Sequence, residues 1–137
     1  MEAIKILVGG LALRNLGSDR YTNDTDYLVN DKSSKKAFIC DEKNNIDYLN
    51  ANGNKLFLEV FNAEKGNTQA TPQSLFDLKA YAFVQHAQNF NWAKADACEY
   101  DLKFLVRKFG CSAKLVKKYV GAGELSEIEK IVKSVKF

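Results

Sequence analysis

Two aspartates separated by one residue, Asp24 and Asp26, are the side chains in this sequence best suited to chemistry. They lie at the start of an apolar stretch with the pattern of a β-strand, where residues two apart point to the same face. Two carboxylates held side by side repel each other unless a positive charge lies between them. A hard divalent cation with oxygen ligands, such as Mg²⁺, would fit there. The pair therefore predicts a metal site, although such a pair alone is also common in solvated turns.

A pair of glycines, Gly9 and Gly10, stands between an apolar strand expected over 3–8 and a short helix expected over 11–16. Glycine lets the backbone approach a bulky anion closely, and the start of a helix offers free N–H groups to phosphate. Gly17 is in the usual position to end this helix. A phosphate cradle followed by metal-holding acids indicates chemistry on a nucleoside triphosphate.

A third acid, Glu59, interrupts the apolar run 55–61, which we interpret as a strand. A carboxylate inside such a run is unfavourable unless it has a positive partner, so we expect Glu59 to face the site. The alternative is an edge-strand acid that faces water.

The elements that must position these residues fall into two groups. The first half of the chain alternates short apolar runs with polar turns, which predicts strands over 3–8, 25–29, 37–40 and 55–61, with 46–49 ambiguous. From Thr71, which can cap a helix, and Pro72, which suits its first position, the pattern becomes helical. Helices are predicted over about 71–89, 93–109, 112–120 and 124–136, with these side chains inward: Leu75, Leu78, Ala82, Leu102, Leu105, Val106, Phe109, Ile128, Ile131, Val132 and Val135.

The predicted fold class is α+β, a small mixed sheet with an N-terminal helix followed by a helical half. At 137 residues we expect one domain, 1–137, with a catalytic sheet half over 1–70 and a helical half over 71–137.

Composition sets the remaining limits. The chain is 46% hydrophobic and 27% charged, without an apolar run long enough for a bilayer or a signal peptide, so we expect a cytoplasmic protein with no membrane partner. Three cysteines without metal spacing are expected to be buried or free thiols. Residues 94–137 carry ten Lys and Arg against six acids, which fits either contact with a phosphate backbone or solvated helix faces.

The run from Gly9 to Asp26 reads Gly-Gly-x-Ala, then Gly17, then Arg-x-Thr-x-Asp-x-Asp, and it resembles the first motif of the nucleotidyltransferase superfamily, which has a polymerase-beta-like fold. The resemblance is closest to the AbiEii-type toxin nucleotidyltransferases and their small relatives. Residues 56–60, 78–82 and 101–105 resemble the second, third and fourth motifs, in the family's order.

The resemblance implies a nucleotidyltransferase that moves a nucleoside monophosphate from an NTP, such as ATP, to a hydroxyl and releases pyrophosphate. It implies two Mg²⁺ ions held by Asp24, Asp26 and Glu59, with Lys79 acting on the phosphates. The residues implied to bind the nucleotide are Gly9, Gly10, Arg20, Thr22 and Lys79.

Two further residues have supporting roles in this interpretation. Asp101 is expected to orient Lys79 rather than touch metal, the alternative being a purely structural acid. His86, seven residues after Lys79, stands where the toxins usually have an arginine, and we expect it to line the groove rather than to act as a base. Cys98 stands where the fourth motif usually has an acid.

The sequence leaves the acceptor open. An RNA 3′ end such as that of tRNA, as in the related toxins, a protein side-chain hydroxyl and a small molecule such as an aminoglycoside all fit. An antitoxin would be a partner if the chain is toxin-like. The rival class is a non-catalytic nucleotide-binding module of the same fold.

Overall fold

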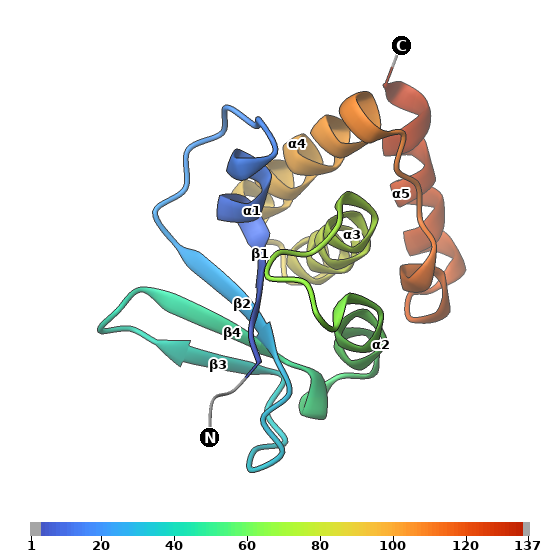
Figure 1. The fold of residues 1–137 in the computed structure, drawn as a ribbon. Coiled ribbons are helices and arrows are strands. Elements are labelled where there is room, and N and C mark those ends of the chain that lie inside the picture. The colour runs from blue at the N-terminus through green and yellow to red at the C-terminus, as the bar shows by residue number, and fades with distance from the viewer. Residues whose placement is uncertain (1–3, 136–137) are drawn as a thin grey trace. The chain divides into compact units, whose positions relative to one another are not determined.

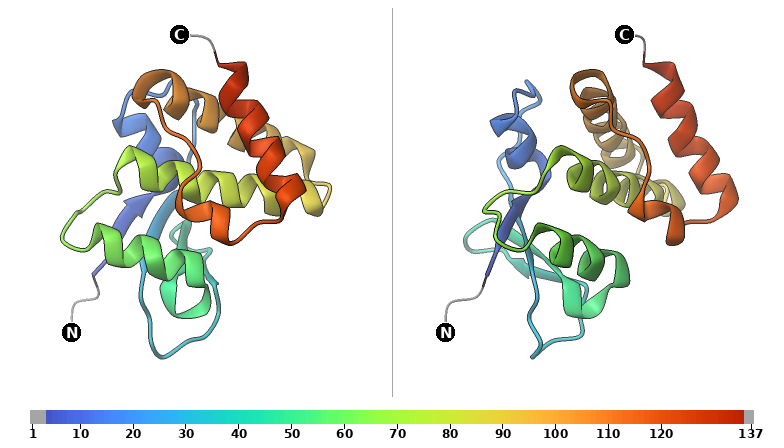
Figure 2. Two further views of the ribbon diagram at one scale, coloured as in Figure 1. Left: turned by 90° about the vertical axis from the view of Figure 1, so that its right-hand side faces the viewer. Right: turned by 45° about the vertical axis from the view of Figure 1, so that its right-hand side comes forward.

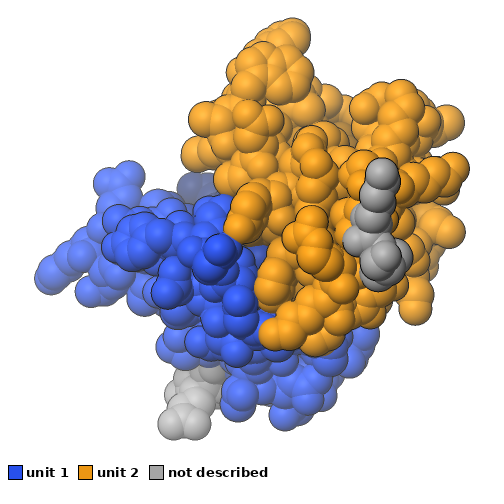
Figure 3. Space-filling view, turned by 90° about the horizontal axis from the view of Figure 1, so that it is seen from above, with its two compact units in different colours: residues 1–71 blue, residues 72–137 orange. Residues whose placement is uncertain are grey.

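The computed structural model describes residues 4–135 of the chain. The chain divides into two compact units, Met1–Thr71 and Pro72–Phe137, which Figure 3 shows in different colours.

The first unit is built on a four-stranded mixed sheet with the order β1-β2-β4-β3 (Figure 1). Strand β2 pairs in parallel with β4, and the other two pairings are antiparallel. The strands are β1 (Ile6–Val8), β2 (Thr25–Val29), β3 (Phe38–Asp41) and β4 (Ile46–Asn50). The prediction for 25–29 is confirmed in full, and the ambiguous stretch 46–49 belongs to a strand.

Two α-helices and a short 3₁₀ helix complete the first unit: α1 (Gly9–Asn15), η1 (Ala51–Gly53) and α2 (Lys55–Glu64). Helix α2 packs on one face of the sheet, where Phe57 meets Phe38 edge to face with ring centroids 5.5 Å apart (Figures 1 and 2). The core between them contains Ile6, Leu28 and Leu56, each fully buried.

The expectation of a strand over 55–61 is wrong, because these residues form helix α2. The Asn54 side chain accepts a hydrogen bond from the backbone N–H of Phe57 and so caps the helix. The buried residues of α2 are spaced by one, three and four positions, as one face of a helix requires: Leu56, Phe57, Val60, Phe61 and Glu64. A strand would have buried every second residue instead.

The second unit is helical. It contains α3 (Pro72–Gln88), α4 (Trp92–Phe109), η2 (Leu115–Lys118) and α5 (Ala122–Ser134). Helices α3 and α4 pack against each other, and α5 packs on α4 (Figure 2). Three of the four predicted helices are confirmed within a few residues. Gly110, with φ of +68°, ends α4 in the left-handed conformation that glycine favours.

Two predictions for the second unit are wrong. The stretch 112–120 contains only the 3₁₀ helix η2, because the carboxylate of Asp77 accepts hydrogen bonds from the backbone N–H groups of Lys114 (3.0 Å) and Val116 (3.2 Å). Asp77 is 1% exposed, so these bonds tie the backbone of the segment to a buried carboxylate. Phe109, expected inside, is 40% exposed at the end of α4.

The structure confirms the predicted α+β class, with a mixed sheet and separate helices. Among residues 4–135, no helix is both long enough and apolar enough to cross a membrane.

Candidate active site

The two glycines lie where β1 passes directly into α1. Gly9 has φ of +72°, a conformation that residues with a Cβ rarely adopt. A Cβ at Gly9 would overlap the carboxylate of Asp26, so that carboxylate lies directly against the Gly9 backbone. The helix starts at Gly9 itself, two residues earlier than we expected.

Gly10 is enclosed by two other residues of the predicted nucleotide site. A Cβ there would stand 2.9 Å from the Thr22 methyl and 3.2 Å from a guanidinium nitrogen of Arg20. The structure thus brings Gly9, Gly10, Arg20, Thr22 and Asp26 together at one corner, as the resemblance implied. We call this set the glycine corner.

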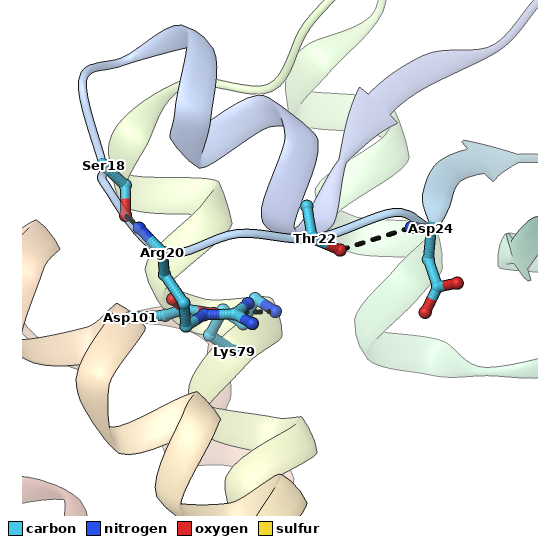
Figure 4. Close-up of polar contacts among 6 residues, drawn as sticks. All are labelled: Ser18, Arg20, Thr22, Asp24, Lys79 and Asp101. Carbon is cyan, nitrogen blue, oxygen red and sulfur yellow. Dashed lines mark hydrogen bonds and ion pairs between the residues drawn. The ribbon is translucent and has the colours of Figure 1, made fainter.

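The loop between α1 and β2 is held by short side-chain turns. The Ser18 hydroxyl accepts a hydrogen bond from the backbone N–H of Arg20, and the Thr22 hydroxyl accepts one from Asp24, both at 3.3 Å (Figure 4). Such local bonds fix the direction in which Arg20 and Asp24 leave the backbone. Asp24 lies one residue before β2 and is exposed, so only Asp26 of the predicted pair is part of the strand.

A residue that the sequence analysis did not single out, Asp47, lies opposite Asp26. Strands β2 and β4 are parallel, and Asp26 is in register with Asp47. Residues opposite each other on neighbouring strands point to the same face, with the strands about 4.8 Å apart. The next residue in this row, Cys40 on β3, is opposite Asp47 and points the same way.

Cys40 interacts through its thiol with its neighbour in this row, Asp47. A hydrogen bond from its thiol to Asp47 raises the pKa of Cys40, and slight burial and the negative charge of Asp47 act in the same direction. Asp47 is therefore an acceptor on the same face as Asp26. Within residues 4–135 the three cysteines form no disulfide: Cys40 is exposed, and Cys98 and Cys111 are buried.

Glu59 does not hold the position that the sequence analysis gave it. It lies on helix α2, not on a strand beside β2. Strand β2 lies between β1 and β4, and the acid opposite Asp26 is Asp47 on β4. The signal that could have revealed this was present: the turn residues 42–45 separate two short apolar runs at hairpin spacing.

The donor set fits a hard cation, although the side chains are not arranged as a ligand group. Within residues 4–135, no three His, Cys, Asp or Glu side chains are placed so that they could hold a metal ion. Asp26 and Asp47 nevertheless supply carboxylate oxygens from adjacent positions on one face, with Asp24 two residues away in the chain. Oxygen donors of this kind are the ligands that Mg²⁺ prefers.

The remaining predicted residues lie in the second unit. Lys79 on α3 forms an ion pair with Asp101 on α4, at 3.1 Å (Figure 4). The Asp101 side chain is 1% exposed and that of Lys79 is 17% exposed, so the pair is largely shielded from water. Asp101 contacts Lys79 as expected, and this contact fixes the lysine head group.

His86 also lies on α3, seven residues after Lys79 and so on the same side of the helix. Partial burial lowers its pKa, and the positive charges of Lys94 and Lys79 lower it further. The imidazole is therefore mostly neutral at pH 7.

Comparisons with protein-family models, with curated proteins and with solved structures find no match to this chain. The features that bear on function are therefore the glycine corner and the two acids in register beside it, Asp26 and Asp47.

Proposed function

We propose that the protein is a Mg²⁺-dependent nucleotidyltransferase that moves a nucleoside monophosphate from an NTP to a hydroxyl acceptor. One observation supports this best: Asp26 lies in register with Asp47 on a parallel strand while its carboxylate contacts Gly9. Two acids beside a glycine corner are the arrangement that the resemblance to nucleotidyltransferases implies, with Asp47 in the role first given to Glu59.

In this proposal Asp26 and Asp47, one on each of two neighbouring strands, hold the cation, and Asp24 stands two residues before Asp26 in the chain. When bound, Mg²⁺ supplies charge neutralisation on the phosphates and lowers the pKa of the attacking hydroxyl. The protein's contribution is to keep the carboxylates adjacent on rigid strands, so that little reorganisation is needed when the charge arrives.

The reaction forms a bond between the acceptor oxygen and the α-phosphorus of the NTP. The bond from the α-phosphorus to the bridging oxygen breaks, and pyrophosphate leaves with that electron pair. The hydroxyl proton passes to a carboxylate, for which we propose Asp47. Arg20, whose guanidinium lies over Gly10, neutralises charge on the phosphates, and Thr22 supports the loop that carries it.

Lys79 remains a candidate for charge neutralisation on the basis of the resemblance. Its ion pair with Asp101 fixes the position of the ammonium group. The acceptor classes stay as the sequence left them: an RNA 3′ end, a protein hydroxyl or a small molecule. A cytoplasmic, toxin-like protein with an antitoxin partner is the biological setting that the resemblance implies.

The test is transfer of label from α-phosphate-labelled NTPs in the presence of Mg²⁺, with total tRNA and lysate protein offered separately. Asp26→Asn and Asp47→Asn should each reduce transfer roughly 100-fold or more, because several kcal/mol of transition-state stabilisation depend on the cation site. Asp96→Asn, at an exposed position on α4, is the control and should transfer normally. Absence of transfer together with absence of NTP binding in calorimetry would reject the enzyme in favour of a module without turnover.

A further inference from the structure

A second polar site lies in the first unit, at the opposite end of the sheet from the acids. A groove of about 630 Å³ is lined by residues that follow β2 and β4 and by one side of α2. Its ten lining residues include three lysines, four asparagines and no acid. We call it the basic groove and define it by Lys32, Lys55 and Lys65 with Asn30, Asn52 and Asn62.

Hydrogen bonds from buried and neighbouring asparagines fix the loop that forms one wall of the basic groove. Asn50, fully buried, accepts a hydrogen bond from the backbone N–H of Asp31 at 2.8 Å and donates to the carbonyl groups of Asp31 and Ser34, both at 3.2 Å. The Asn52 amide donates to the same Ser34 carbonyl at 2.7 Å. These bonds tie the loop after β2 to η1, and Figures 1 and 2 show the two segments side by side. Lys32 is therefore held near the start of α2.

The lysines of the groove have no acidic partner among the described residues, and the Lys65 ammonium lies 5.8 Å from the centroid of the Phe61 ring. Within the part of the chain that the structure describes, no carboxylate forms an ion pair with Lys32, Lys55 or Lys65. Asp31, the nearest acid in the sequence, accepts hydrogen bonds from the backbone and hydroxyl of Ser33 instead. Three ammonium groups around one polar groove favour an anionic ligand, and the asparagine amides can bond its oxygens.

The spacing of the lysines suits an extended ligand. Lys55 is the first residue of α2 and Lys65 directly follows its last residue, so the two positions are about 15 Å apart along the helix. A chain with a phosphate at each unit can place a separate phosphate beside each of these lysines. The groove is also separate from the acids, because Asp26 and Asn30 are four residues apart on an extended strand, about 13 Å.

We infer that the basic groove binds the phosphate backbone of a single-stranded nucleic acid. This inference goes beyond the proposed function, since binding requires neither NTP nor transfer. A strand seated there would be recognised through its phosphates and would show little base preference.

The experiment measures the anisotropy of a fluorescent 12-nucleotide single-stranded RNA titrated with the full chain at several salt concentrations. The variant K32Q/K55Q/K65Q should bind at least about tenfold more weakly, with a salt slope reduced by about 2, because each lost phosphate contact in single strands removes about 0.7. K43Q/K94Q/K133Q changes three exposed lysines outside the groove and has the same net charge, so it should lose much less. K32R/K55R/K65R keeps the charge and should bind like the wild type.

Three results would overturn the inference: wild-type affinity in the groove variant, equal losses in the groove and control variants, or ATP or inorganic phosphate binding as tightly as the RNA. Circular dichroism checks that each variant is folded. Asp26→Asn should bind the RNA normally, which separates this inference from the proposed function. If the wild type binds RNA through the groove but transfers no nucleotide, the proposed function fails. If it transfers nucleotide but does not bind RNA through the groove, this inference fails.

Discussion

The two ends of the first unit's sheet differ in charge although they are made from the same pair of strands. The starts of β2 and β4 carry Asp26 and Asp47 in register, while the chain that follows both strands carries lysines and asparagines. Parallel strands cause this sorting, because their starts meet at one end of the sheet and their ends at the other. The proposed cation site and the proposed anion site therefore lie at opposite ends of the same sheet.

The two ends of the sheet also differ in their effect on the stability of the first unit. At the acid end, like charges lie on neighbouring strands, an arrangement that destabilises a sheet. At the basic end, the buried Asn50 bonds the loop that carries Lys32 and stabilises the local structure. The end with Asp26 and Asp47 carries an unfavourable arrangement that a functional role would explain. The end with Lys32 combines the hydrogen bonds of Asn50 with the proposed binding groove.

The largest expected effect concerns which acid completes the candidate active site. Asp47→Asn should reduce nucleotide transfer roughly 100-fold or more, whereas Glu59→Gln should stay within about tenfold of the wild type, because Asp47 is in register with Asp26 on the neighbouring strand and Glu59 belongs to helix α2. Steady-state transfer rates of the two variants check this. A larger loss for Glu59→Gln would restore the original assignment.

Gly9→Ala should destabilise the protein, because Gly9 lies against Asp26 at the end of the sheet that carries the acids. A Cβ at φ of +72° is strained, and here it would also overlap Asp26, so the free energy of unfolding should fall by about 1–3 kcal/mol or more. Urea unfolding measures this. Gly66→Ala is a matched control, because Gly66 has φ of +93° with nothing within 4 Å of a new Cβ. If both variants lose the same stability, strain alone matters and Asp26 is not packed against Gly9.

Asn50→Ala should affect the basic end in two ways. Removal of a buried side chain that makes three bonds to the loop after β2 should lower the free energy of unfolding by about 1–3 kcal/mol. It should also weaken RNA binding, since Lys32 would lose its fixed position. Asn62→Ala, at an exposed position on α2, should leave stability unchanged. Unchanged stability in Asn50→Ala would contradict the role given to this network.

The smallest expected effect concerns Cys40. Because the hydrogen bond to Asp47 raises the thiol pKa, alkylation by iodoacetamide should be slow at pH 8 and continue to increase beyond pH 9. Asp47→Asn should lower that pKa and speed the reaction a few-fold at pH 8, with the two rates converging at high pH. Peptide mapping distinguishes Cys40 from Cys98 and Cys111, which are both buried. Burial raises the thiol pKa of Cys111 to about 11. Equal rates at pH 8 would show that the thiol and the carboxylate do not interact.

The sequence predicted the elements whose signals are local. Strand 25–29 is recognisable from its β-branched and apolar residues, and the end of α4 from Gly110. The glycine corner was likewise predictable, because its residues are close together in the chain.

The predictions that failed have two kinds of cause: a pattern that was misinterpreted, and contacts between residues distant in the sequence. The run 55–61 has helical spacing and an asparagine cap at Asn54, which outweigh its β-propensity. Strand β4 depends on pairing with both β2 and β3, so 46–49 alone could not reveal Asp47 as a site residue. The missing helix over 112–120 depends on the buried Asp77, which is distant in sequence.

The register between β2 and β4 has a consequence for thermal behaviour. Repulsion between the Asp26 and Asp47 carboxylates opposes the native state, so either Asp→Asn change should raise the melting temperature even as it removes activity. A cation that binds only the native chain would have the same sign of effect, growing with the logarithm of its concentration. Melting curves recorded with increasing Mg²⁺ would then report occupancy of this site.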